Sequence, residues 1–208
     1  MSRFRALVLD LGNVLVRSQP PDLVRRMSEI ALVPLATFTK AYWSHRNAYD
    51  LHGDARRYWN EVLRDAGSPL DGFAGEKALM SLSAVDAESW TQYREELWEI
   101  AAAFRATGGQ TALLSNCNPE VMGLVRAQRA VERYFDTLVV SSEVGCLKPD
   151  PAIYLIALRR LGVEPGDALF VDDRAENVAG ATAVGLQALL FKGDGSVGEL
   201  RRRLEQAT

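Results

Sequence analysis

The sequence predicts an α/β fold: a Rossmann-like open parallel sheet as the core, with an all-helical cap inserted into it. Three observations predict this fold. Short, nearly continuous apolar runs recur along the chain, as in strands that helices cover on both faces. Helical patterns lie between the later runs, an alternation typical of parallel sheets with right-handed crossovers. A much longer helical segment separates the first run from the second.

Five apolar runs are the predicted strands. They occupy residues 4–10, 111–115, 137–142, 168–173 and 187–191. Because their hydrophobicity is nearly continuous, we expect helices on both faces of the sheet.

The helices of the predicted core have recognisable ends. An apolar helical face precedes Gly108-Gly109, which ends that helix. Asn118-Pro119 and Asp150-Pro151 each place a capping side chain directly before a proline in the first helical turn. Residues 175–185 predict the last crossover helix.

The segment between the first two strands is far longer than one crossover needs. It contains helical patterns, such as residues 54–67, and no convincing strand. We therefore expect a core domain formed by residues 1–16 and 96–208, and a helical cap formed by residues 17–95. The cap should lie above the carboxyl ends of the strands, where open α/β sheets bind ligands. Most aromatic residues of the cap are expected to pack into its own small core.

The composition excludes several classes of partner. The chain has 208 residues, 48% of them hydrophobic, and a net charge of −3 with both signs interspersed. Neither a nucleic acid nor a membrane is an expected partner, because there is no large basic surface and no apolar stretch near the roughly 18 residues that span a bilayer. Two cysteines and no signal-peptide pattern favour a reducing cytoplasm. We expect a monomer or a homodimer.

Polar residues follow four of the predicted strands. Taken singly, each has an ordinary explanation, such as a turn, a helix cap or a surface charge. Together they place three carboxylates, a lysine, a hydroxyl and an amide at one rim of the sheet, because parallel strands end at the same edge. These residues are Asp10, Ser115, Asn116, Lys148, Asp172 and Asp173.

This combination suits phosphoryl transfer. Three carboxylates with backbone carbonyls make an oxygen site of the kind that Mg²⁺ prefers, so we expect Mg²⁺ as the cofactor. Asp10 is the predicted nucleophile and would form an aspartyl-phosphate that water hydrolyses. Lys148 would neutralise the phosphate, and Ser115 with nearby backbone N–H groups would hold its oxygens.

Four motifs in order resemble those of the haloacid dehalogenase-like (HAD) hydrolases. They are "DLGNVL", "LLSNCN", "SSEVGCLKPDPAIYLIAL" and "FVDDRAENVAGATAVG". The resemblance implies that Asp10 is both nucleophile and metal ligand, and that the carbonyl of Gly12 is a second ligand. It further implies phosphate binding by Ser115 and Asn116, a catalytic role for Lys148, direct Mg²⁺ binding by Asp173, and binding through water by Asp172.

Gly12 departs from the pattern of most phosphatases in this family. They carry there a second aspartate that protonates the leaving oxygen and later activates water. Glycine leaves that proton to water or to the cap, which predicts a preference for acidic leaving groups. With glycine, the motif resembles a branch that includes α-D-glucose-1-phosphate phosphatases, so the substrate expected is a small phosphorylated metabolite such as a sugar phosphate.

Two alternatives stay open at this point. A dehalogenase of the family also lacks the second acid, but it lacks the paired metal-binding acids as well. A non-catalytic phosphate-binding regulator is the other alternative, and the intact residues at Asp10 and Lys148 argue against it. In the cap, His45, Arg46 and Tyr49 are candidates to face the substrate, although an exposed helical face explains them equally well.

Overall fold

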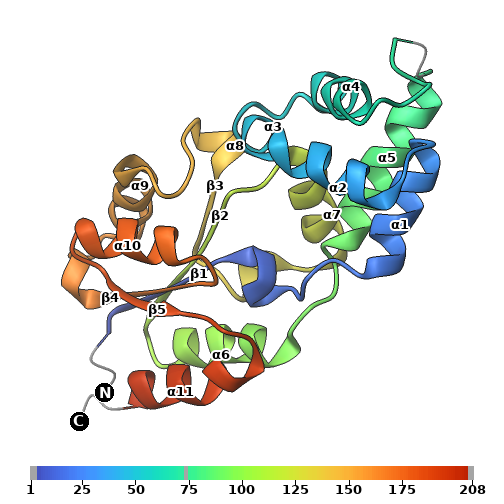
Figure 1. Ribbon diagram of the computed structural model, residues 1–208. Helices are drawn as coiled ribbons and strands as arrows, with labels where there is room; N and C mark the ends of the chain where they lie inside the picture. The colour runs from blue at the N-terminus through green and yellow to red at the C-terminus, as the bar shows by residue number, and fades with distance from the viewer. Residues whose placement is uncertain (1–3, 73–74, 206–208) are drawn as a thin grey trace.

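A computed structural model describes residues 4–72 and 75–205. Its centre is a five-stranded, fully parallel sheet in the order β3-β2-β1-β4-β5 (Figure 1). All five predicted strands are present, and most are shorter than the apolar runs that predict them. Their bounds are β1 Ala6–Leu9, β2 Gln110–Ser115, β3 Thr137–Val140, β4 Ala168–Asp172 and β5 Gln187–Leu190.

Strand β1 is buried on both faces because it lies at the centre of the sheet. It pairs with β2 on one side and β4 on the other, and its four residues are all buried. Leu7 and Leu9 belong to the apolar core on one face of the sheet, and Ala6 and Val8 belong to the apolar core on the opposite face. The alternation follows from the two-residue period of a strand.

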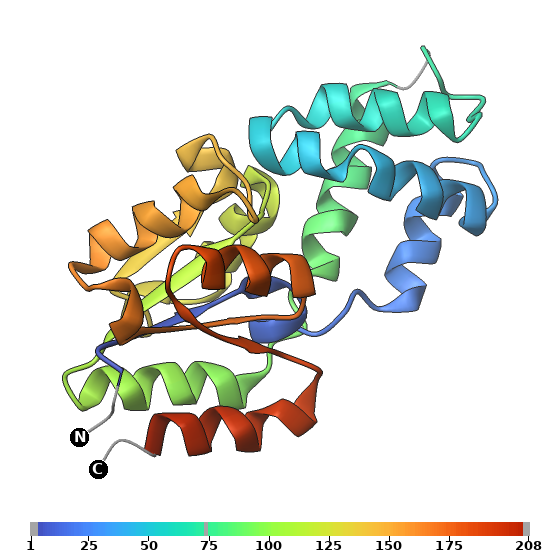
Figure 2. The same cartoon turned by 60° about the vertical axis from the view of Figure 1, so that its left-hand side comes forward.

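Helices cover the two faces as expected for this fold. One face carries α6 Glu95–Ala106, α7 Pro119–Gln128 and α11 Val197–Glu205, and the other carries α9 Pro151–Leu161 and α10 Ala175–Ala183. Figure 2 shows α6 and α11 side by side on one side of the sheet and α9 and α10 on the other. The predicted caps are present, since Asn118 accepts a hydrogen bond from Val121 N and Asp150 accepts one from Ala152 N. The shorter turns are Leu11–Leu15, Val131–Arg133, α8 Ser141–Val144, Pro165–Asp167 and Asp194–Ser196.

Five helices between β1 and α6 form a body with its own apolar core, and we call them the cap. They are α1 Pro21–Ile30, α2 Leu35–Ser44, α3 Arg46–His52, α4 Ala55–Asp65 and α5 Glu76–Ser89. Tyr42, Tyr58 and Trp59 are buried in that core with Tyr49. Trp43 differs from them, because half of its surface is exposed.

The two segments that join the cap to the sheet run side by side. Val16 pairs with Tyr93 in an antiparallel bridge, and Arg17 N donates to Gln92 O at 2.7 Å. The chain therefore leaves and re-enters the core at one place (Figure 2). Among the described residues, no helix is both long and apolar enough to cross a membrane.

Candidate active site

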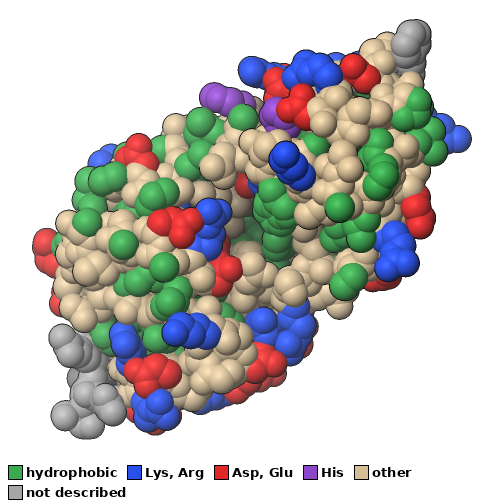
Figure 3. All heavy atoms as spheres, in the orientation of Figure 1, with side chains coloured by type: hydrophobic (Ala, Val, Ile, Leu, Met, Phe, Trp, Pro, Cys, Tyr) green, Lys and Arg blue, Asp and Glu red, His purple; other side chains and the backbone are tan. Residues whose placement is uncertain are grey.

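The predicted polar residues converge at the carboxyl edge of the sheet. Asp10 follows central β1, Ser115 ends the neighbouring β2, and Asp172 ends the other neighbour, β4. The surface is hollowed between this edge and the cap, and charged side chains lie around the opening (Figure 3). A cavity of about 290 Å³ lies there, and its lining includes Asp10, Ser115, Asn116, Lys148 and Asp173.

Lys148 holds two carboxylates of the site together. Its Nζ lies 2.7 Å from Asp10 Oδ1 and 2.6 Å from Asp172 Oδ2, and it also donates to Leu114 O at 3.0 Å. All three charged groups are buried. Burial lowers the pKa of Lys148, but the two carboxylates raise it further, so its net pKa lies above the ordinary value and the side chain is an ammonium.

Asp10 is held in place by two donors on the same oxygen. Its Oδ1 accepts from Leu11 N at 2.7 Å and from Lys148, while no described residue donates a hydrogen bond to its Oδ2. Burial raises the pKa of Asp10 to about 7, against the opposing charge of Lys148. The pKa of Asp173 is also raised, chiefly by burial.

The donor set at this edge fits a hard divalent cation. Oxygen atoms of Asp10, Asp172 and Asp173 lie within 4.8 Å of one another. The three carboxylates face one ammonium, which leaves excess negative charge, and oxygen-only sites of this kind favour Mg²⁺. Asp172 differs from the other two because its oxygens already accept from Lys148, from Arg174 N at 2.8 Å and from Asn177 Nδ2 at 3.0 and 3.1 Å.

The turn after β1 brings Asn13 to the acidic cluster, a contact that the sequence did not indicate to us. Asn13 has a φ of 55°, in the left-handed region that asparagine tolerates better than most residues. Its Nδ2 donates to Asp173 Oδ2 at 2.9 Å. The asparagine directly after Gly12 was the available signal, because left-handed positions in turns favour this residue.

The backbone conformation at position 12 does not require glycine. Its φ is −63°, and a Cβ added there would meet only Trp90 Cζ3 at 3.5 Å, which is an ordinary contact. A side chain at position 12 would therefore begin in contact with the Trp90 ring, without a clash.

Asn116 makes contacts that differ from its expected role. Its Oδ1 accepts from Lys148 N at 2.8 Å, and its Nδ2 donates to Lys148 O at 2.9 Å. Asn116 thus clamps the backbone of the residue whose side chain organises the site. Phosphate binding by Asn116 stays a prediction, as it does for Ser115, which is buried in the same cavity wall.

The cap contributes Arg46 to this cavity, whereas the other two cap candidates lie elsewhere. His45 Nε2 lies 2.6 Å from Asp65 Oδ2, and Tyr49 donates from its hydroxyl to Glu120 Oε2 at 2.7 Å. Both line a separate small cavity on the α4 side. The inward face of α3 is the one that carries Arg46 and Asp50, one helical turn apart, so our expectation that His45 and Tyr49 face the substrate is corrected.

Four cap-side residues of the cavity wall were not among the sequence candidates. They are Trp43, Asn47, Asp50 and Trp90. Trp43 and Trp90 contact each other edge to face with ring centroids 6.4 Å apart. A half-exposed tryptophan in an otherwise aromatic-rich helix gives no sequence signal, because the same pattern describes a buried core residue.

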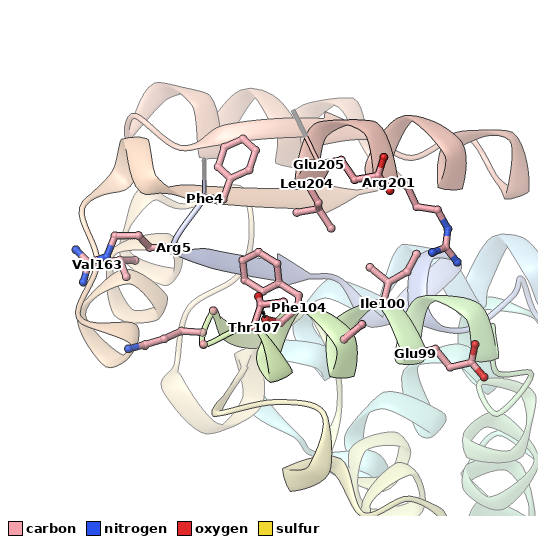
Figure 4. A pocket seen from close by; sticks show the side chains of 14 residues that line it. Phe4, Arg5, Glu99, Ile100, Phe104, Thr107, Val163, Arg201, Leu204 and Glu205 are labelled. Atoms are coloured by element: carbon pink, nitrogen blue, oxygen red, sulfur yellow. Dashed lines mark hydrogen bonds between the residues drawn. The ribbon is translucent and has the colours of Figure 1, made fainter. Parts of the chain in front are cut away.

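A larger cavity lies elsewhere in the described part of the chain. It has about 800 Å³ and lies between α6 and α11, where Ile100, Phe104 and Leu204 point into it (Figure 4). None of the acidic cluster lines it, so its size does not indicate the place of the chemistry.

Comparison with known proteins shows the family of this chain. A family model described as haloacid dehalogenase-like hydrolase matches residues 4–185. The chain belongs to the haloacid dehalogenase-like hydrolases. The resemblance of the four motifs is thereby confirmed at the level of the family.

Three curated relatives of this HAD hydrolase have different names. Mouse "Acyl-CoA dehydrogenase family member 10" is 28% identical over 204 residues, which are 89% of this chain and 18% of that protein. "(S)-2-haloacid dehalogenase 1" of Pseudomonas sp. (strain CBS-3) is 38% identical over 88 residues, 42% of this chain and 38% of that protein. "Phosphoglycolate phosphatase 1" of Pseudomonas aeruginosa is 25% identical over 188 residues, 88% of this chain and 67% of that protein. The chain thus spans less than half of the first two.

Solved structures show the same fold. A HAD family enzyme of Bacteroides thetaiotaomicron aligns with a TM-score of 0.78 at 20% identity, covering 96% of this chain and 98% of that one. The wild-type form of the same enzyme, in complex with magnesium and inorganic phosphate, aligns with a TM-score of 0.70 at 18% identity, covering 92% and 96%.

Proposed function

We propose that this HAD hydrolase is a Mg²⁺-dependent phosphomonoesterase that acts on a small phosphorylated metabolite. The observation that carries the proposal is the buried ammonium of Lys148 between Asp10 and Asp172, beside an oxygen-only cluster of acids. This arrangement provides a fixed carboxylate nucleophile and cationic charge for a phosphate in one place.

The free oxygen of Asp10 is the proposed nucleophile. Leu11 N and Lys148 hold Oδ1, which leaves Oδ2 to form a bond to phosphorus while the bond from phosphorus to the leaving oxygen breaks. Water then attacks the phosphorus of the aspartyl-phosphate, and the bond to Asp10 breaks. Inorganic phosphate leaves and the carboxylate is restored.

Asp10, the carbonyl of Gly12 and Asp173 are the residues that would hold Mg²⁺. Asp172 would contribute through water, since protein donors occupy both of its oxygens. The metal would supply positive charge against the phosphate oxygens. Ser115 and Lys148 would bind the phosphate from the other side.

Two relatives support this activity and its substrate class. The Pseudomonas aeruginosa relative is a phosphoglycolate phosphatase, and the Bacteroides enzyme of the same fold binds magnesium and phosphate. Within the class, a sugar phosphate such as glucose 1-phosphate is the proposed substrate, because glycine at position 12 in "DLGNVL" resembles that branch. No nucleic-acid partner is proposed, and a monomer or homodimer in the cytoplasm stays a prediction.

A dehalogenase is the second candidate. The 38% identity to a haloacid dehalogenase and the missing carboxylate at position 12 favour it. The Asp172-Asp173 pair beside Asp10 disfavours it, because displacement of a halide needs no metal ion.

A substrate panel separates these activities. The protein is assayed against phosphorylated metabolites and 2-haloacids, with Mg²⁺ and with EDTA, and both phosphate and halide are measured. We expect phosphate release that EDTA abolishes and Mg²⁺ restores. Halide release that survives chelation would support the dehalogenase, and tight binding of a phosphate analogue without any turnover would support a regulator.

A further inference from the structure

The missing side chain at Gly12 raises the question of which group protonates the leaving oxygen. A proton donor must face the cavity that holds Asp10. Among the described residues that line this cavity, the carboxyl groups are Asp10, Asp50 and Asp173. Asp10 is the nucleophile and Asp173 belongs to the acidic cluster, which leaves Asp50 on cap helix α3.

The other polar groups of the cavity wall are poor proton donors. Lys148 is held as an ammonium between two carboxylates, and the guanidinium groups of Arg46 and Arg174 do not release protons. Burial raises the pKa of Cys117 well above its ordinary value, so its thiol keeps its proton. These properties leave the carboxyl group of Asp50.

Around Asp50, two buried carboxylates share one guanidinium group, that of Arg46. Arg46 contacts two buried acids, since its Nε lies 3.0 Å from Asp50 Oδ1 and its Nη1 lies 2.9 Å from Asp86 Oδ1. Asp86 is fully buried and also accepts from the Tyr42 hydroxyl at 2.5 Å. Asp50 accepts from Arg46 Nε at 3.0 and 3.2 Å and from Asn118 Nδ2 at 3.4 Å, which are on average longer contacts than the 2.5 to 3.0 Å of Asp86. Asp50 is therefore the site at which a proton is retained.

The groups that face Asp50 come from every element around it. They are Arg46 on its own helix, Tyr58 on α4, Asp86 on α5, and Cys117 with Asn118 before α7. Tyr42 on α2 bonds Arg46 and Asp86 beside them. Burial raises the pKa of Asp50 to about 6, against the charge of Arg46 and with the help of Asp86. A carboxylic acid with this pKa can both give and take a proton near neutral pH.

Two contacts fix Asp50 against the core. Ser141 Oγ donates to Asp50 O at 2.5 Å, and Asn118 Nδ2 lies 3.4 Å from Asp50 Oδ1. Ser141 directly follows β3, and Asn118 caps α7, so both anchors belong to the same sheet edge as the acidic cluster. These contacts hold Asp50 in a fixed position relative to the site residues of the core.

We propose that Asp50 is the general acid and base that replaces the side chain missing at Gly12. The proposal rests on the proposed phosphomonoesterase function. In the first step Asp50 gives its proton to the leaving oxygen as the bond to phosphorus breaks. In the second step the Asp50 carboxylate takes a proton from the water that attacks the aspartyl-phosphate, which restores the starting state.

The test is the Asp50→Asn variant on phosphomonoesters with leaving groups of graded pKa. General acid catalysis is worth about 10²- to 10⁴-fold and matters most for basic leaving groups. We expect kcat/KM of Asp50→Asn to fall by that factor for primary alkyl phosphates and to change little for aryl phosphates of acidic phenols. If Asp50 supplies the proton, the wild-type protein should show a shallow dependence on the leaving group, in place of the preference for acidic leaving groups expected from Gly12 alone, and the variant should show a steep one.

The matched control is Tyr49→Phe. It removes another contact between α3 and the core, the hydrogen bond to Glu120, but from the side of α3 that lines the separate cavity. Its leaving-group dependence should equal that of the wild type. Equal losses for all esters in Asp50→Asn would indicate a purely structural role and overturn the proposal, and so would an unchanged dependence.

The wild-type pH profile gives a test that needs no variant. As pH rises above about 6, Asp50 loses its proton, so kcat/KM for an alkyl phosphate should fall relative to that for an aryl phosphate. Parallel profiles for the two esters would contradict a role of Asp50 as an acid. Absence of any Mg²⁺-dependent phosphate release would instead refute the proposed function, and the two failures are therefore distinguishable.

Discussion

At the scale of single residues, the site depends on the unequal surroundings of its acids. Asp10 and Asp172 share the ammonium of Lys148, Asp173 accepts a hydrogen bond from Asn13, and Asp50 shares Arg46 with Asp86. Because each carboxyl group has different neighbours, the same chemical group can serve as nucleophile, metal ligand or acid at different positions of one cavity.

Substitution of Asp10 tests the nucleophile. Asp10→Asn is nearly isosteric, but its amide cannot attack phosphorus, so we expect kcat to fall by several orders of magnitude. Steady-state kinetics with a phosphomonoester measure the loss, and a thermal melting curve verifies that the fold is retained. A variant that keeps a tenth of the activity with an unchanged melting curve would show that another group is the nucleophile.

A carboxyl group introduced at position 12 tests whether Asp50 performs the task of the side chain that Gly12 lacks. Space for a Cβ exists beside Trp90, so Gly12→Asp can place a carboxyl group two residues after the nucleophile. In the Asp50→Asn background, we expect Gly12→Asp to recover at least about tenfold of the roughly 10²- to 10⁴-fold lost on alkyl phosphates. The recovery should be partial, because the new side chain begins in contact with the Trp90 ring.

The comparison of single and double variants on alkyl and aryl phosphates measures this recovery. Aryl phosphates of acidic phenols serve as the control, since their turnover should differ little among the folded proteins. If the double variant folds and turns over aryl phosphates yet recovers nothing on alkyl phosphates, position 12 and Asp50 do not perform the same task.

At the scale of secondary-structure elements, neighbouring strand ends hold one another in place. The residue after β2, Asn116, holds the loop before α9 through two hydrogen bonds to the backbone of Lys148. This clamp connects the second motif to the third, although 32 residues separate them in the sequence. Lys148 reaches Asp10 and Asp172 from a backbone that is fixed in this way.

Removal of the clamp should displace Lys148. In Asn116→Ala, the N–H and the carbonyl of Lys148 lose their partners, which costs about 1–3 kcal/mol of stability when such groups are buried. We expect a lower free energy of unfolding and a fall in kcat of at least about tenfold, since a small misplacement of a catalytic group has large effects. Chemical denaturation and steady-state kinetics measure the two quantities.

The neighbouring Ser142→Ala variant is the control for Asn116→Ala. Ser142 also bonds a backbone carbonyl of this region, that of Cys117, but it does not touch Lys148. Its kcat should stay near the wild-type value. Full activity in Asn116→Ala would mean that the ion pairs with Asp10 and Asp172 suffice to position Lys148.

At the scale of the whole molecule, the cavity lies between two bodies with separate apolar cores. The sheet and its helices contribute the proposed nucleophile Asp10, the ammonium of Lys148 and the acidic cluster, and the cap contributes Arg46, Asp50 and Trp43 to the cavity wall. Hydrogen bonds from Ser141 and Tyr49 join the two bodies beside the cavity. On the proposed mechanism, the core would supply the nucleophile and the metal ligands, and the cap would supply the proton through Asp50 and the wall around the leaving group.

The sequence by itself determined the fold class, the strands, the helix caps and the grouping of polar residues at one edge of the sheet. Each of these depends on short-range patterns: apolar runs, capping side chains before proline, and polar residues directly after strands. Asp10, Ser115, Lys148 and Asp173 could be grouped in advance because parallel strands end at the same edge of a sheet.

Only the tertiary structure decided which cap residues reach that edge. Asp50 meets Asn118 across 68 positions, and Asn13 meets Asp173 across 160, so no local pattern contains these contacts. His45 and Tyr49 resembled site residues by their position in the sequence, but the packing of α3 between α4 and the core turns Arg46 and Asp50 inward instead. The orientation of a helix depends on all the surfaces it buries at once, and those surfaces exist only in the folded chain.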